Sequence, residues 1–172
     1  IYPDGELRNL TQAAGKGIAS GFQGTGSIAV RDLSTSWDGQ RLYFSMIEDG
    51  LDGYCQEPNC PDYRWQIYKM ENFGQGQTPI ISKIPNQPYY NNIDPIEATD
   101  QETILFVSDR PRDGSPHHYP LRDEYELEET TSGIWRLKPS GELTIIDHSP
   151  SGSQDIMIDS YRRLLSIRWD HL

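Results

Sequence analysis

The fold of this chain is decided by Ile104-Leu105-Phe106-Val107-Ser108, a short apolar run bounded by polar turn residues. Such a run, with β-branched and aromatic members, is typical of a strand that is covered on both faces. Similar runs occur 62 positions earlier, as Leu42-Tyr43-Phe44-Ser45-Met46, and 60 positions later, as Leu164-Leu165-Ser166-Ile167-Arg168. The recurrence predicts a structural unit that is present several times in the chain.

A turn motif recurs with the same unit. Pro3-Asp4-Gly5-Glu6-Leu7 and Pro139-Ser140-Gly141-Glu142-Leu143 are nearly identical and lie 136 positions apart. Midway between them, at an offset of 68 from Pro3, is another glycine turn, Asn72-Phe73-Gly74-Gln75-Gly76. Together with the apolar runs, these turns indicate a repeat of about 61 to 68 residues.

Each repeat contains four predicted strands. Residues 65–70 and 134–137 alternate bulky and polar side chains, as third strands with one face in a core would. Each is followed by a glycine-containing turn and a second alternating run, at 78–82 and 142–146, which predicts a hairpin of third and fourth strands. The first strands are expected at residues 28–37, 92–99 and 155–160.

We therefore predict an all-β chain that forms part of a β-propeller with four-stranded antiparallel blades. Residues 1–27 would be the end of one blade and a flexible link, 28–85 and 86–149 two blades, and 150–172 the start of the next. Joining the ends would give a ring of three blades, fewer than the usual four to eight. We therefore expect the remaining blades to come from the same protein or another chain, and both ends to expose strands that lack partners.

The charge of the chain limits its partners. The net charge of −11 repels phosphate backbones, and no basic stripe offsets it, so nucleic acid is not an expected partner. No apolar run in the sequence has the length of a membrane span.

Cys55 and Cys60 are the two cysteines, and both lie between a predicted second and third strand. Their spacing is compatible with a small disulfide loop, which would indicate an oxidising compartment. Two free thiols and a metal site are the alternatives, although the sequence nearby offers no further ligands at the usual zinc spacing. No Cys-x-x-Cys-His signature of covalent haem attachment is present.

The motifs of the repeat resemble a known family. Val107-Ser108-Asp109-Arg110-Pro111 and Gly133-Ile134-Trp135-Arg136-Leu137 are similar to the WD40-like propeller repeats of the Tol system protein TolB. Tyr89-Tyr90-Asn91-Asn92, His148-Ser149-Pro150-Ser151-Gly152 and Arg168-Trp169-Asp170-His171-Leu172 resemble large bacterial proteins related to the alpha subunit of hydrazine synthase. The resemblance implies a propeller in a periplasmic or extracellular bacterial protein. Any haem would be bound outside this segment.

The loop from residue 109 to residue 132 is the strongest candidate for a site, because it is long and rich in charge. It contains the predicted ligand- or partner-binding residues Asp109, Arg110, His117, His118, Asp123 and Glu124. As a metal site it would use Asp123, Glu124 and Glu126, whose oxygens suit calcium, with His117 or His118 favouring a transition metal. As an acid/base pair, Asp109 and either Glu124 or Asp123 would serve hydrolysis. The simplest alternative is that its arginines pair with neighbouring carboxylates and fix the loop.

Three further candidates follow from their positions in the repeat. Asp109 and Asp170 each follow a second strand, so an aspartate repeats there and is expected to accept backbone N–H groups of a neighbouring turn. His171, beside Asp170, and His148, in the link between two units, complete the predicted binding residues. His148 would either fix the turn or face the central channel.

The sequence predicts a non-catalytic propeller segment that serves as a protein- or ligand-binding scaffold in a larger protein. No nucleophile elbow and no phosphate-binding loop are present, so catalysis by this segment has no support. The alternative is the propeller part of a c-type haem oxidoreductase related to hydrazine synthase. A propeller hydrolase is the third possibility.

Overall fold

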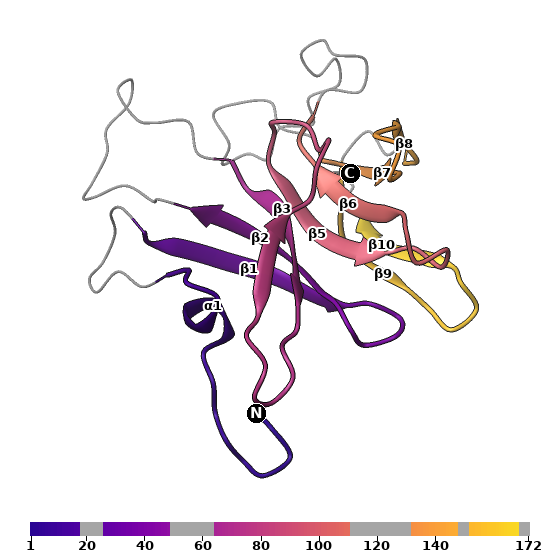
Figure 1. Cartoon of the computed structure of the whole chain (residues 1–172). Helices are drawn as coiled ribbons and strands as arrows, with labels where there is room; N and C mark the ends of the chain where they lie inside the picture. Colours follow the sequence, from indigo (N-terminus) through magenta and orange to yellow (C-terminus); the bar gives the residue numbers. More distant parts are fainter. Residues whose placement is uncertain (18–25, 49–63, 111–131, 148–151, 169–172) are drawn as a thin grey trace.

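In the computed structural model, the chain is an all-β protein built from antiparallel sheets (Figure 1). The structure describes residues 1–17, 26–48, 64–110, 132–147 and 152–168. Within these ranges, no helix is long and apolar enough to cross a membrane. The one helix described there, α1 (Leu10–Ala13), is a single turn, and the side chain of Asn9 caps it by accepting the backbone N–H of Gln12 at 3.0 Å. The sequence did not predict this turn, which lies at the start of the expected flexible link.

The described strands form three sheets, each with its strands in chain order. The first sheet is β1 (Ile28–Thr35), β2 (Leu42–Glu48), β3 (Gln66–Glu71) and β4 (Ile80–Lys83). The second is β5 (Asn92–Glu97), β6 (Ile104–Ser108), β7 (Gly133–Leu137) and β8 (Leu143–Ile145). The third contains β9 (Ser153–Ile158) and β10 (Leu164–Arg168). All pairings are antiparallel, which confirms the predicted four-stranded unit and its strand order.

The sheets pack face to face, and alternate residues of an inner strand enter different cores. In β2, Tyr43 faces the second sheet, whereas Phe44 packs on the other side against the segment that contains Leu10. In β6, Phe106 lies between the first and second sheets, and Leu105 lies between the second sheet and β9. This two-sided burial is why β2 and β6 are apolar runs and not alternating strands.

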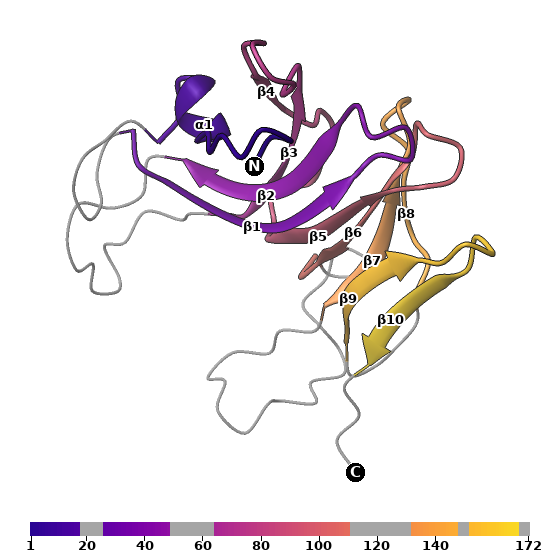
Figure 2. The same cartoon turned by 90° about the horizontal axis from the view of Figure 1, so that it is seen from below.

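The first strands of the three sheets run next to one another. β1 contacts β5, and β5 contacts β9, so the inner edges of the sheets converge while the outer strands spread apart (Figures 1 and 2). The described sheets form an open stack and do not close into a ring.

The two Pro-x-Gly-Glu-Leu motifs adopt the same turn. In the first, Tyr2 and Glu6 are joined by a backbone hydrogen bond of 2.9 Å, and Gly5 has a φ of +86°. In the second, Lys138 and Glu142 are joined at 3.0 Å, and Gly141 has a φ of +88°. Glycine adopts this left-handed conformation without strain because it has no Cβ atom. The sequence match therefore reflects a repeated local structure.

Candidate functional site

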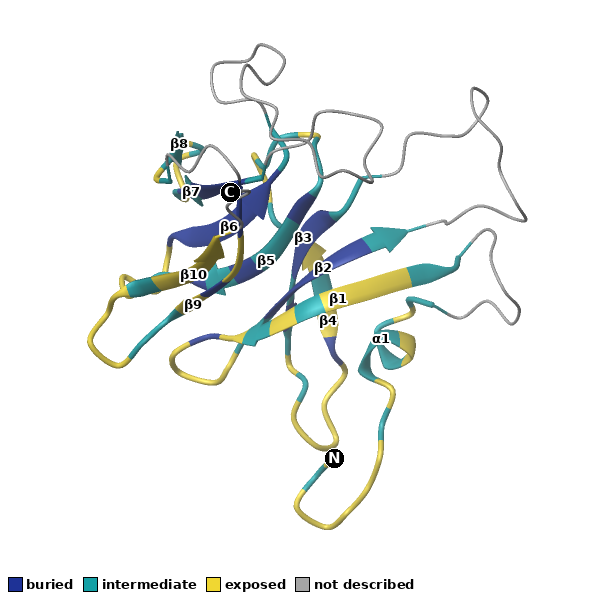
Figure 3. Cartoon of the chain, turned by 180° about the vertical axis from the view of Figure 1, so that it is seen from behind, coloured by how far each residue is buried: buried dark blue, intermediate teal, exposed yellow. Residues whose placement is uncertain are grey.

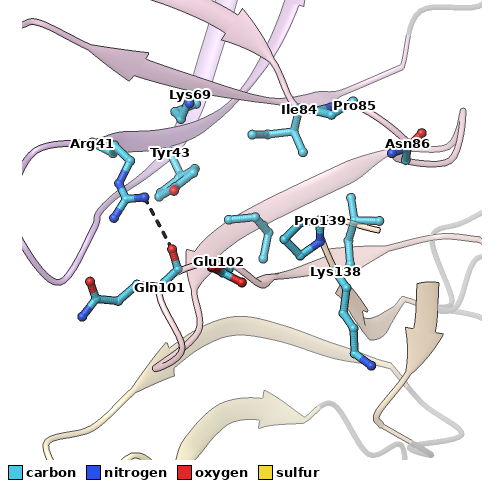
Figure 4. Close-up of a pocket in the computed structure, with 12 residues that line it drawn as sticks. Arg41, Tyr43, Lys69, Ile84, Pro85, Asn86, Gln101, Glu102, Lys138 and Pro139 are labelled. Atoms are coloured by element: carbon cyan, nitrogen blue, oxygen red, sulfur yellow. Dashed lines mark hydrogen bonds between the residues drawn. The ribbon is translucent and has the colours of Figure 1, made fainter. Parts of the chain in front are cut away.

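A groove of about 390 Å³ lies between the first and second sheets and is the candidate binding site of the described structure (Figure 4). It extends from Arg41 and Gln101, in turns that join first and second strands, to Asn86 and Pro139 at its other end. Its base is apolar because it lies over the core that the two sheets share. The residues that form this base are Tyr43, Ile84, Pro85, Ile104 and Leu137.

A buried carboxylate organises the Arg41 end of the groove. The side chain of Glu97 is fully buried and accepts hydrogen bonds from Tyr43 Oη at 2.9 Å and from the backbone N–H of Trp37 at 3.1 Å. Arg41 Nη2 lies 3.1 Å from the same carboxylate. Burial, and then the hydrogen bond to Glu97, raise the pKa of Tyr43, so its hydroxyl stays protonated and donates. The arrangement links the first and second sheets.

Two lysines on the rim of the groove are paired with carboxylates. Lys69 Nζ lies 2.9 Å from Glu71, and Lys138 Nζ lies 2.8 Å from Glu142. Such exposed pairs contribute little stability, but they leave the rim polar around an apolar base. The combination of an apolar base and a polar rim suits an amphipathic ligand or a polypeptide segment.

The predicted residues Asp109 and Arg110 lie at the opposite end of β6 from the groove. The Asp109 carboxylate accepts two hydrogen bonds from Asn91, one from its backbone N–H and one from its Nδ2, both at 2.8 Å. This is the structural contact expected of an aspartate after a second strand. Arg110 places its guanidinium 4.9 Å from the ring centre of Trp135, and its backbone N–H donates to Ser108 Oγ at 3.2 Å.

The other predicted site residues lie outside the described residues, so the structure does not relate them to Asp109 or to the groove. They are His117, His118, Asp123, Glu124, Glu126, His148, Asp170 and His171. Cys55 and Cys60 also lie outside, and their disulfide stays a prediction. In the described part of the chain, no group of three or more His, Cys, Asp or Glu residues is placed to hold a metal ion.

Sequence reasoning missed a ladder of aspartates on the converging first strands. Asp32, Asp94 and Asp155 occupy equivalent positions and have φ values of 55°, 51° and 49°. The register of each first strand with its second strand shifts at this point, which marks a β-bulge. The signal was available as three aspartates at steps of 62 and 61. It was missed because the repeat was identified from its apolar runs and glycine turns.

The carboxylates of Asp32 and Asp94 each accept a hydrogen bond from the next sheet. The backbone N–H of Asp94 donates to Asp32 Oδ2 at 3.3 Å, and the backbone N–H of Asp155 donates to Asp94 Oδ2 at 3.0 Å. Burial raises the pKa of Asp94 to about 6, and the nearby carboxylates of Asp32 and Asp155 add to the rise. The Asp155 N–H and, more weakly, Arg31 act in the opposite direction. The ladder thus joins three sheets through hydrogen bonds from backbone N–H groups to carboxylates, although it brings like charges close together.

Comparison with known proteins does not add a functional assignment. No protein-family model matches the chain, and a search of curated proteins found no match. The TolB and hydrazine synthase resemblances therefore rest on the motifs of the sequence.

Proposed function

We propose that this chain is part of a β-propeller that acts as a non-catalytic binding scaffold in a larger bacterial protein. The observation that carries the proposal is the aspartate ladder, since the same bulged residue of three successive first strands links each sheet to the next. Four-stranded meanders that stack face to face, with their first strands converging, are the arrangement of propeller blades.

The scaffold role is supported by what the polar groups do. Glu97 and Asp109 use their carboxylates to join chain segments, and the cations at the rim of the groove are paired with carboxylates. The groove has an apolar base and a polar rim, and surfaces of this composition are typical of binding sites. Partners would be the remaining blades and a ligand or protein segment in the groove or on the 109–132 loop.

A periplasmic or extracellular location belongs to the same proposal. It rests on the TolB-type resemblance and on the predicted disulfide between Cys55 and Cys60. Intact mass spectrometry after alkylation without reductant tests the disulfide directly. Two alkyl groups on the unreduced protein would contradict it.

The alternatives differ from the scaffold in measurable ways. A haem oxidoreductase related to hydrazine synthase requires c-type haem in the full-length protein, which a pyridine haemochrome assay detects. A hydrolase requires activity that is lost when both Asp109 and Glu124 are replaced by alanine. Neither alternative draws support from a described contact.

The decisive experiment is electron cryo-microscopy of the full-length protein isolated from its bacterium. We expect a ring of about four to eight blades, in which the described sheets are consecutive, with a further domain or subunit seated on the ring. An open sandwich of sheets would contradict the proposed propeller fold. A ring with no domain or subunit bound to any face would contradict the proposed scaffold role.

A further inference from the structure

The charges that line the groove between the first and second sheets are not balanced. The two lysines on its rim each have a carboxylate partner, and Arg41 Nη2 has two, Glu97 at 3.1 Å and Asp38 at 3.2 Å. Glu102 also lines the groove, and its carboxylate forms no hydrogen bond or ion pair with the residues that the structure describes. The unpaired charge of the groove is therefore negative.

Glu102 lies where a partner can reach it. It belongs to the turn before β6, and this turn is exposed whereas β6 is buried along its length (Figure 3). Figure 4 shows Glu102 between Gln101 and Pro139, which also line the groove. The net charge of −11 on the chain adds to the attraction of this carboxylate for a cation.

The two sides of the groove favour an extended polypeptide as its occupant. An occupant has the apolar base on one side and the polar rim and solvent on the other. Successive side chains of an extended chain point to opposite faces, so a segment of alternating apolar and polar residues matches both sides. The groove volume of about 390 Å³ is near the lower end of the range of about 300–1,000 Å³ for ligand sites, which limits the bound part to a few residues.

We propose that the groove binds an extended segment of a partner protein in which apolar residues alternate with lysine or arginine. The apolar side chains pack on Tyr43 and Ile84, and a basic side chain pairs with Glu102. An acidic segment would bring its charges close to Glu102, within the field of a negatively charged chain. The inference rests on the proposed scaffold function and adds the chemistry of its partner.

The test compares two synthetic hexapeptides with blocked ends. One alternates leucine with lysine, and the other alternates leucine with glutamate. Isothermal titration calorimetry with the 172-residue chain should show saturable binding of the lysine peptide and no binding of the glutamate peptide at the same concentrations. In nuclear magnetic resonance spectra of the isotope-labelled chain, the lysine peptide should shift the amide resonances of Asn86, Gln101 and Glu102.

Variants test the charged and the apolar contacts separately. Glu102→Gln should weaken binding of the lysine peptide about threefold, as expected for loss of one exposed ion pair. The matched control Glu6→Gln removes the same charge from an exposed residue that does not line the groove, and should leave binding unchanged. Ile84→Ala shortens a partly buried side chain of the base and should weaken binding about fivefold. Circular dichroism checks that each variant remains folded.

The proposal would be overturned by no binding, by equal binding of the two peptides, or by resonance shifts confined to residues outside the groove. Equal weakening by Glu102→Gln and Glu6→Gln would also overturn it. A dimer of the free chain that Glu102→Gln disperses would assign the groove to a second copy, which contradicts the proposal. The ring and its bound domain or subunit are observed in the full-length protein without these peptides, so failure of this inference and failure of the scaffold are distinguishable.

Discussion

Replacement of Asp94 by asparagine should stabilise the protein at neutral pH. The carboxylate of Asp94 is half-buried between the carboxylates of Asp32 and Asp155, and its pKa is raised to about 6 from an ordinary value of 3.8. Asparagine tolerates the φ of 51° at this position and keeps an oxygen that accepts the N–H of Asp155. The variant Asp94→Asn therefore removes the charge while preserving the link between the sheets.

The magnitude follows from the difference in pKa. A rise from 3.8 to about 6 corresponds to about 3 kcal/mol between the two protonation states. Because Asp94 is partly exposed, solvent screening reduces this value, and we expect about 1 kcal/mol at pH 8. In a chain of this size that is a rise of about 2–4 °C in Tm.

The sign of the pH dependence is fixed by the raised pKa of Asp94. Asp94 binds the proton more tightly in the folded than in the unfolded chain, so its contribution to stability rises as pH falls through about 6 and levels off near 4. The advantage of Asp94→Asn should therefore be full at pH 8 and absent at pH 4. Urea unfolding at a series of pH values measures it.

The control is Asp38→Asn, an exposed aspartate whose pKa is lowered by hydrogen bonds from Ser36 and from the backbone N–H of Gln40. It should lose stability at neutral pH, which is the opposite sign. An Asp94→Asn protein that is less stable than wild type at pH 8, or whose difference from wild type does not change with pH, would refute the reasoning.

Other substitutions test the cores, the turns and the Asp109 contact. Phe106→Ala should cost about 3–5 kcal/mol in urea unfolding, since Phe106 is fully buried between two sheets, and a cost below 1 kcal/mol would contradict that packing. Gly141→Ala should lower Tm more than Gly5→Ala, because both have positive φ but only an added Cβ at Gly141 meets another side chain, at 3.2 Å; equal losses would be inconsistent with this difference. Asp109→Ala should cost about 1–2 kcal/mol by leaving the Asn91 amide groups unpaired, and unchanged stability would argue against the structural role.

The strand order could be predicted from sequence because burial on both faces leaves a strong pattern. The apolar runs at 104–108 and 164–168 coincide with β6 and β10, and the predicted hairpins overlap β3 with β4 and β7 with β8. The run in β6 exists because that strand contributes to two cores, whereas β10 has a similar pattern although most of its residues are exposed. The turn at Gly5 was identifiable because its conformation requires glycine, so the residue is repeated at Gly141.

The site was less predictable because its features depend on contacts between distant residues. In the sequence, Glu97 is an isolated acidic residue at the end of a predicted strand. Only the fold brings Tyr43 and Arg41 next to its carboxylate. The groove arises where two sheets diverge, which no local pattern encodes. Asp109 was predicted to accept a backbone N–H group, and its contact with Asn91 confirms this role.

We propose that the three sheets are consecutive blades around one axis, and a crystal structure of this chain tests this arrangement. The rotation that superposes the first sheet on the second should also superpose β5 and β6 on β9 and β10, about the same axis. For four to eight blades that rotation is about 45–90°. Two rotations about different axes, or sheets aligned within about 30° as in a sandwich, would contradict the account.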